Sequence, residues 1–205
     1  MLSDQAVTAQ LDSPDYSSKA DCRRYFKYVR GSLELAQLSQ QLCARLERWP
    51  TLQTARTILA YWAMADEIDL SSLVNRWPEK IWGLPRTLPQ RQMAWHTYHP
   101  GDALYCSQWG VLEPDSHRPV IPLESVDVML VPAIACDRQG TRLGYGGGFY
   151  DRCLAAPHLS GALAVGIIPH ACWSAAVLPC DAWDVRLGAI ATERDIWVRE
   201  PELVE

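Results

Sequence analysis

The sequence predicts a single α/β domain, a three-layer α/β/α sandwich around a largely parallel sheet. Short apolar runs typical of buried strands alternate with amphipathic stretches of helical spacing along the 205 residues, and this alternation favours that architecture. The length suits one domain with a substantial core, and no internal repeat is visible. Residues 1–18 are polar and aperiodic at their start, so we expect a flexible N-terminal tail, followed by one domain over residues 19–200.

Two helices are predicted before the first strand. Apolar residues recur at helical spacing from Lys19 onward, and Ser17 or Ser18 can accept a hydrogen bond from the first free backbone N–H groups. A second helix is predicted over residues 35–49. Pro50 should end it, because proline cannot continue a helical hydrogen-bond ladder.

Six short apolar runs predict the strands, and the stretches between them predict the remaining helices and loops. We expect strands over residues 57–62, 80–84, 93–98, 126–132, 162–168 and 189–192, the last of which closes the sheet. Helices are predicted over residues 70–77 and 148–156 and near Trp173, a turn over residues 85–89, and a loop over residues 99–123.

Composition excludes several classes of protein. The net charge of −5 argues against a nucleic-acid binder, which concentrates positive charge, and no apolar run is long enough to span a membrane. The seven cysteines form no CxxC pair or zinc-ligand spacing, and the five histidines form no metal motif. An odd number of cysteines and no secretion signal predict a cytoplasmic protein.

The most informative segment reads RLGYGGGFYDR, from Arg142 to Arg152. Glycine loses more conformational freedom on folding than any other residue, so such a run is expected where the backbone needs positive φ or a ligand approaches closely. A predicted strand precedes the run and a predicted helix follows it. Free N–H groups and a helix dipole would then converge on one spot, which predicts a phosphate site. The segment fits neither the Walker A nor the dinucleotide template, and a tight structural turn is the alternative.

Five segments in the same order closely resemble those of the 5-formyltetrahydrofolate cyclo-ligase family. They are VPAIACDRQG followed by RLGYGGGFYDR, Lys19-x-x-x-Arg23, Asp66-Glu67-Ile68, Trp109 to Pro114, and Leu178-Pro179 followed by Trp183-Asp184. Together they extend over nearly the whole chain. The resemblance implies a fold of the ribose-phosphate isomerase and CoA-transferase type. It also implies an ATP- and Mg²⁺-dependent ligase that converts 5-formyltetrahydrofolate, with or without further glutamates, into 5,10-methenyltetrahydrofolate.

The resemblance implies that the first helix and the glycine segment bind ATP. Lys19 and Arg23 are one helical turn apart and face the same side, although a solvated surface pair is the alternative. Tyr145 and Gly147 stand where some relatives carry arginine and lysine, so fewer cations remain to balance phosphate. The expected ATP-binding residues are Lys19, Arg23, Arg142, Leu143, Gly144, Tyr145, Gly146, Gly147, Gly148, Phe149 and Tyr150.

Two aspartates are expected to hold the metal ion. Asp151 follows the glycine segment directly, and Asp184 resembles the family's second magnesium carboxylate. Mg²⁺ favours one or two carboxylates together with phosphate oxygens and waters. On residues alone, Asp151 could equally be an acidic residue at a helix N-terminus and Asp184 a turn aspartate.

The folate site is expected to combine one carboxylate with aromatic walls. Parallel strands present their carboxyl ends to one cleft, which should bring Glu67 and the glycine segment together. Glu67 could accept hydrogen bonds from the pterin, and Trp62, Trp109, Phe149 and Tyr150 could stack on it. Trp62 stands where the family has leucine or phenylalanine. We expect no protein nucleophile and a monomer. A folate-binding protein without turnover, and a sugar-phosphate isomerase or CoA-transferase relative, are the other hypotheses.

Overall fold

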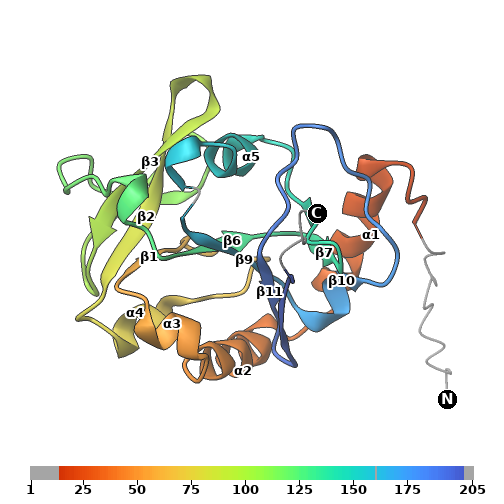
Figure 1. Cartoon of the computed structure of the whole chain (residues 1–205), viewed down its shortest axis with the longest axis horizontal. Coiled ribbons are helices and arrows are strands. Elements are labelled where there is room, and N and C mark those ends of the chain that lie inside the picture. The colour runs from red at the N-terminus through yellow and green to blue at the C-terminus, as the bar shows by residue number, and fades with distance from the viewer. Residues whose placement is uncertain (1–13, 160, 201–205) are drawn as a thin grey trace, which may run out of the picture.

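A twisted seven-stranded sheet runs through the middle of the protein (Figure 1). The computed structural model describes residues 14–159 and 161–200, so residues 1–13 of the tail predicted over residues 1–18 lie outside the described residues. The strand order is β12-β11-β9-β6-β1-β2-β3. The five central strands are parallel: β1 (Thr57–Leu59), β2 (Ile81–Leu88), β6 (Val128–Pro132), β9 (Leu163–Ile167) and β11 (Ala189–Ala191). The antiparallel strands β3 (Gln92–Tyr98) and β12 (Ile196–Val198) form the edges, so the prediction of a largely parallel sheet is confirmed.

Alternating side chains of the central strands build two separate cores. In β6, Val128 and Leu130 belong to one buried cluster, whereas Met129 and Val131 belong to the other. Successive side chains of a strand point to opposite faces, so a strand that is apolar throughout must be covered on both. This arrangement gives the three layers that the sequence predicts.

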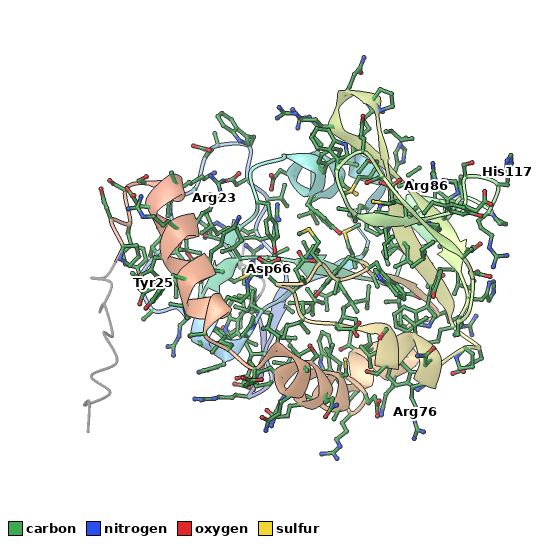
Figure 2. The ribbon with its side chains drawn as sticks, turned by 180° about the vertical axis from the view of Figure 1, so that it is seen from behind. Arg23, Tyr25, Asp66, Arg76, Arg86 and His117 are labelled. Atoms are coloured by element: carbon green, nitrogen blue, oxygen red, sulfur yellow. The ribbon has the colours of Figure 1, made fainter. Side chains whose placement is uncertain are left out.

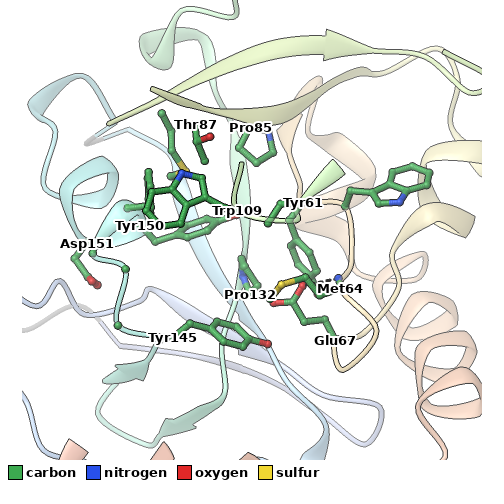
Figure 3. Close-up of a pocket in the computed structure, with 18 of the residues that line it drawn as sticks. Tyr61, Met64, Glu67, Pro85, Thr87, Trp109, Pro132, Tyr145, Tyr150 and Asp151 are labelled. Atoms are coloured by element: carbon green, nitrogen blue, oxygen red, sulfur yellow. Dashed lines mark hydrogen bonds between the residues drawn. The ribbon is translucent and has the colours of Figure 1, made fainter. Parts of the chain in front are cut away.

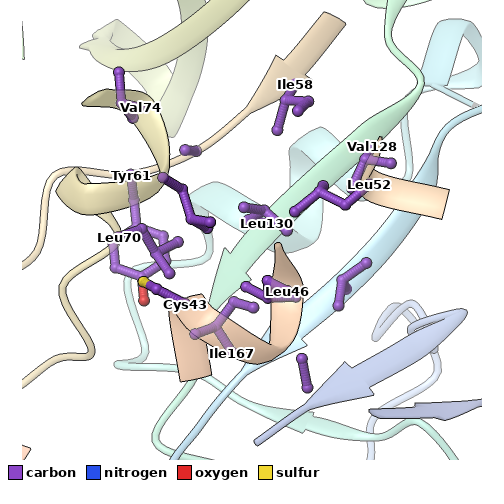
Figure 4. Close-up of a cluster of buried hydrophobic side chains, with 14 of the residues drawn as sticks. Cys43, Leu46, Leu52, Ile58, Tyr61, Leu70, Val74, Val128, Leu130 and Ile167 are labelled. Atoms are coloured by element: carbon purple, nitrogen blue, oxygen red, sulfur yellow. The ribbon is translucent and has the colours of Figure 1, made fainter. Parts of the chain in front are cut away.

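Helices α2 (Leu35–Leu46), α3 (Pro50–Thr54) and α4 (Ser71–Arg76) cover one face of the sheet (Figures 1 and 4). Leu42, Leu46 and Leu52 from these helices are fully buried against β1, β6 and β9. Pro50 does more than end the preceding helix, because it begins α3. Proline is well suited to the first helical position, where its missing N–H would have no partner.

Helices α1 (Lys19–Gly31) and α5 (Phe149–Leu154) contribute to the second core. Ser18 caps α1 by accepting a hydrogen bond from the backbone N–H of Asp21 at 3.2 Å, which confirms the predicted start of the helix. The buried face of α1 contains Cys22, Phe26 and Arg30. No helix in the described part of the chain has the length and apolar character needed to cross a membrane.

Two predictions about the middle of the chain are wrong. Strand β2 passes through Pro85, and the turn lies at Pro89–Arg91 instead of residues 85–89. Strand β1 ends opposite Gly83, so beyond it β2 has a partner on one side only, and an edge position tolerates a residue without an N–H group. Residues 99–123 are not only loop, because β4 (Leu104–Cys106) and β5 (Leu112–Pro114) form a hairpin there.

The C-terminal part also differs from the prediction. A short helical turn, His170–Cys172, precedes β10 (Trp173–Ser174), where a helix near Trp173 is predicted. Strand β10 pairs with β7 (Ala135–Asp137), which in turn pairs with β8 (Arg142–Leu143), in a small second sheet. Residues 189–192 do not close the main sheet, because β12 adds one more strand. Strand β8 of this small sheet ends directly before Gly144, the first glycine of the segment.

Candidate active site

Two cavities open on either side of the glycine loop, residues 144–148. The first, which we call the apolar cavity, has a volume of about 280 Å³. It is lined by Tyr61, Trp62, Met64, Glu67, Pro85, Thr87, Met93, Trp109, Val111, Glu113, Pro132, Tyr145, Gly147, Phe149 and Tyr150, together with the shared residues named below. All five predicted substrate-binding residues line it. Glu67 and the glycine loop lie together there, as the strand-end argument predicts.

The second, which we call the cationic cavity, has a volume of about 690 Å³. Its own lining consists of Lys19, Arg23, Arg91, Leu143, Arg152, Ala155, Asp181, Trp183 and Asp184. The two cavities share Arg142, Gly144, Gly146, Gly148 and Asp151. A molecule in each cavity would therefore meet its neighbour at the glycine loop. Four residues predicted to bind ATP, Tyr145, Gly147, Phe149 and Tyr150, line the apolar cavity and not the cationic one.

The glycine loop connects β8 to α5 in a conformation that few other residues could adopt. Gly148, directly before α5, has φ of +71°, in the left-handed region that favours glycine. At Gly144, a Cβ atom would lie 2.6 Å from the Nη1 atom of Arg142. Side chains at these positions would disturb the loop, so the glycines keep the backbone open to both cavities.

The basic residues predicted in α1 both reach the cationic cavity. The ammonium group of Lys19 forms ion pairs with Asp184 and, at 2.6 Å, with Asp181. The Nε atom of Arg23, on the side of α1 that faces the glycine loop, donates to the carbonyl oxygen of Gly144 at 2.8 Å (Figure 2). The loop and the helix are thus joined by a hydrogen bond from a cation.

Charge pairing shifts the pKa values of Lys19 and Asp184 toward their charged forms. Burial opposes the charged form of Lys19, but the hydrogen bonds that its ammonium donates to Asp181 and Asp184 outweigh burial and raise the lysine's pKa. Burial likewise opposes ionised Asp184, but the Lys19 hydrogen bond and the Asp181 backbone N–H together lower its pKa below 3.8. Both groups are therefore fully charged at neutral pH.

Arg142 lies between the two cavities and is almost fully buried. Its guanidinium forms an ion pair with Asp151, and its Nη1 atom donates to the carbonyl oxygen of Pro132 at 3.4 Å. The two predicted metal ligands, Asp151 and Asp184, line the same cavity, and each faces a cation. Within residues 14–159 and 161–200, no group of three or more His, Cys, Asp or Glu side chains could hold a metal ion.

Glu67 provides a buried carboxylate at the edge of the apolar cavity (Figure 3). Its Oε2 atom accepts a hydrogen bond from the backbone N–H of Met64 at 2.9 Å. Burial raises the pKa of Glu67, and hydrogen bonds from Met64 and Tyr145 only partly offset that effect. The ring of Tyr61, which also lines the cavity, is fixed by a hydrogen bond from its hydroxyl to the carbonyl oxygen of Ile68 at 2.8 Å.

Aromatic rings form the walls of the apolar cavity. Trp109, on the β4–β5 hairpin, packs edge-to-face against Phe149 of α5, with ring centroids 5.7 Å apart. Trp109 lines the cavity and is 58% exposed, so a flat ligand could cover its ring. Trp62 makes a similar edge contact with Tyr98 at 5.6 Å, which anchors one wall to the sheet.

Arg30 does not line either cavity but positions Tyr145, which lines the apolar one, and the sequence analysis does not identify it. Its guanidinium is 2% exposed, donates to the hydroxyl of Tyr145 at 2.9 Å, and pairs with Asp66 at 3.2 Å. It also lies over the ring of Tyr145, 5.5 Å from the centroid. Position 30 follows Arg23 by seven residues and therefore lies on the same helical stripe, a signal that could have identified it.

Arg91 was also missed, and no local pattern could have revealed it. It lies at the tip of the β2–β3 hairpin with φ of +60°, far from the other lining residues in sequence, yet its side chain lines the cationic cavity. The tertiary position of the β2–β3 hairpin alone brings Arg91 to the cationic cavity.

A sequence profile of the 5-formyltetrahydrofolate cyclo-ligase family matches residues 16–193. The chain belongs to the 5-formyltetrahydrofolate cyclo-ligase family. The cyclo-ligase of Escherichia coli K12 is 31% identical over 170 residues, which cover 78% of this chain and 91% of that protein. The Haemophilus influenzae cyclo-ligase is 33% identical over 138 residues, covering 65% of this chain and 73% of that protein.

Solved structures of cyclo-ligase relatives share the fold. The 5,10-methenyltetrahydrofolate synthetase of Aquifex aeolicus superposes with a TM-score of 0.77 at 27% identity, covering 91% of this chain and 96% of that one. The corresponding Mycoplasma pneumoniae synthetase gives 0.66 at 17% identity, covering 86% and 99%, which supports the fold alone. The expected family, fold class and enzymatic character are therefore confirmed: this chain is a ligase of the cyclo-ligase family.

Proposed function

We propose that this chain converts 5-formyltetrahydrofolate and ATP into 5,10-methenyltetrahydrofolate, ADP and phosphate. One observation carries the proposal: an aromatic cavity with a buried carboxylate meets a cavity rich in cations at the glycine loop. A reaction that transfers a phosphoryl group to a bound folate needs these two environments side by side. The relatives named after this activity support the proposal.

ATP would bind with its phosphates in the cationic cavity. Backbone N–H groups of the glycine loop, together with Lys19 and Arg23, can neutralise phosphate oxygens. Arg142 lines both cavities, so its guanidinium is placed to stabilise charge on the phosphoryl group during transfer.

The residues present fit a magnesium ion. Asp151 and Asp184 supply two carboxylates in one cavity, and each pairs with a cation that favours its ionised form. Mg²⁺ usually takes only one or two protein carboxylates and completes its shell with phosphate oxygens and waters. When bound there, it would neutralise phosphate charge, and exchanging the Lys19 and Arg142 contacts would free the carboxylates to bind it.

The folate would occupy the apolar cavity. Glu67 can accept hydrogen bonds from N–H groups of the pterin, while Trp109 and Tyr150 provide flat apolar surface for the ring. The wall near Trp62 is also apolar and completes the slot.

The reaction requires no nucleophile from the protein. The formyl oxygen of the folate attacks the terminal phosphorus of ATP, an O–P bond forms, and ADP leaves. N10 of the same folate then attacks the activated formyl carbon, the C–O bond breaks with loss of phosphate, and N10 releases its proton. The second attack is intramolecular, so correct positioning supplies about 7–11 kcal/mol in favourable cases.

The test is the absorbance of the methenyl product. Wild-type protein with 5-formyltetrahydrofolate, ATP and Mg²⁺ should form it, and omission of ATP should abolish its formation. Folate binding without ATP-dependent product would instead support a binding protein without turnover and would contradict the proposal. Asp151→Ala should raise the Mg²⁺ concentration needed for half-maximal rate, with Asp195→Ala, outside both cavities, as the matched control.

We also propose a monomer in the cytoplasm, acting on folates with or without further glutamates. All seven cysteines are free thiols in the structure, which suits a reducing compartment. Gel filtration with light scattering should give the mass of one chain, 23.1 kDa. A dimer mass would contradict the first part.

A further inference from the structure

An unusually exposed tryptophan lies at the rim of the cationic cavity. Trp183 is 71% exposed, the largest exposed fraction among the large apolar side chains of the described residues. It belongs to the loop between β10 and β11, which is drawn in blue and arches beside α1 in Figure 1. Among all described residues, no other aromatic ring and no cation stacks against the ring of Trp183.

Trp183 differs in chemistry from everything else that lines this cavity. The other lining residues are cations, carboxylates, glycines and two aliphatic residues, so Trp183 is the single aromatic side chain among the described lining residues. Cations and loop N–H groups suit a polyphosphate, but they offer no surface to a flat heterocycle. The indole ring offers that surface.

The order of the two cavities decides which end of a nucleotide would reach Trp183. The terminal phosphate must lie next to the folate, and therefore beside residues that both cavities share, such as Arg142 and Gly146. The rest of the nucleotide must extend into the part of the cationic cavity that is not shared. Trp183 lines that part, together with Lys19 and Asp184, and does not line the apolar cavity.

We propose that Trp183 is the stacking platform for the base of the bound nucleotide. This inference rests on the proposed function and adds the residue that recognises the nucleoside. The stacked ring would cover the exposed indole face, while Lys19 beside it contacts the phosphate chain. Base–aromatic stacking is expected to change affinity by about 10- to 100-fold.

Binding of ATP and of inorganic tripolyphosphate, measured by calorimetry, separates the base from the phosphates. Trp183→Ala should weaken ATP binding by about 10- to 100-fold and leave tripolyphosphate binding unchanged. Trp183→Phe should restore most of the ATP affinity, because phenylalanine retains a flat ring. Val177→Ala, an exposed apolar residue of the same segment that lines neither cavity, should leave both affinities unchanged.

Fluorescence provides a second readout. The chain has nine tryptophans, so the difference between wild type and Trp183→Phe isolates the signal of one. ATP should quench the wild type, tripolyphosphate should not, and Trp183→Phe should bind ATP without that quench.

The outcomes also separate this inference from the proposed function. If wild type binds ATP and forms product, but Trp183→Ala binds ATP as tightly as wild type, the stacking role is wrong and the proposed function stands. Equal loss of ATP and tripolyphosphate binding would mean that Trp183 maintains the conformation of the β10–β11 segment and does not contact the base. A higher KM for folate with unchanged ATP affinity would assign the ring to the folate. Absence of ATP binding in wild type would overturn both proposals.

Discussion

The apolar and cationic cavities share one wall, but they shift the pKa values of their carboxyl groups in opposite directions. In the apolar cavity, burial raises the pKa of Glu67, so the fold opposes the charge that it needs there. In the cationic cavity, Asp151, Asp181 and Asp184 each pair with a cation, and the pKa of Asp184 is lowered. The ionised carboxylate of Glu67 therefore destabilises the fold, whereas that of Asp184 stabilises it. Changes on each side should reveal this difference.

The largest effect is expected where the cavities meet. Arg142→Met would remove the guanidinium that lines both and leave the Asp151 carboxylate unpaired. We expect kcat to fall by about 10²- to 10³-fold, because a donor aimed at the transferring group is lost. Steady-state measurement of product absorbance checks this.

Arg194→Met is the matched control for Arg142→Met. Arg194 is exposed and lies outside both cavities, and within the described part of the chain its ion-pair partner is the neighbouring Glu193, so its loss should leave kcat close to wild type. A decrease of less than about tenfold for Arg142→Met would contradict its placement at the point of transfer.

Glu67→Gln should separate function from stability in the apolar cavity. We expect the KM for folate to rise by about 10- to 100-fold, because a hydrogen bond to a charged acceptor is lost. Burial raises the pKa of Glu67 in the folded state above 4.5, so wild type loses stability as pH rises through that window. The variant lacks this loss and should have the higher melting temperature at pH 7.

The advantage of Glu67→Gln should disappear below pH 4.5, where the wild-type carboxyl is protonated in both states. Thermal melts of both proteins at pH 4 and pH 7 measure it. A variant that is less stable than wild type at pH 7 would show that Glu67 is stabilised, contrary to the interpretation of its burial.

Lys19→Met should show the opposite pH dependence in the cationic cavity. The lowered pKa of Asp184 means that its pairing stabilises the fold above pH 3.8 and is lost as pH falls through the lower, folded-state value. We expect Lys19→Met to be less stable than wild type by about 1 kcal/mol at pH 7. The difference should shrink in acid.

Denaturation of Lys19→Met at pH 7 and pH 3 measures that change, and the KM for ATP should rise by about tenfold. Lys80→Met is the control for loss of a lysine, because the Lys80 ammonium donates to backbone oxygens of Gln53 and Ala55, lies over the ring of Trp77, and forms no ion pair within the described residues. A stability difference that stays constant with pH would rule out pairing with Asp184 as its cause.

The smallest effect is expected for Tyr145→Phe. Its hydroxyl accepts a hydrogen bond from Arg30, and hydrogen bonding from Tyr145 lowers the pKa of Glu67. Without the hydroxyl, the pKa of Glu67 should rise further, so the acidic limb of kcat/KM for folate should move to higher pH. The KM at pH 7 should rise by about threefold. An unchanged acidic limb would mean that Tyr145 does not act through Glu67.

Local patterns predicted much of the fold and missed elements that depend on distant partners. The capped helix at Lys19 and the buried strand β6 were predictable, since capping and apolar runs are properties of neighbouring residues. The β4–β5 hairpin was predicted as loop, because its prolines and glycines suggest irregular backbone. Its strands exist through pairing with each other. Strand β12 likewise depends on β11 as a partner.

The sequence alone determined the family, the glycine loop and the residue types that serve each cavity, because residue order and chemistry are recorded in it directly. Only the tertiary structure determined which cavity each of those residues lines. It turned Tyr145 toward Glu67, brought Arg91 from a distant hairpin to the cations, and left the ring of Trp183 exposed at the rim. Such placements arise from packing between segments far apart in the chain, which no local spacing encodes.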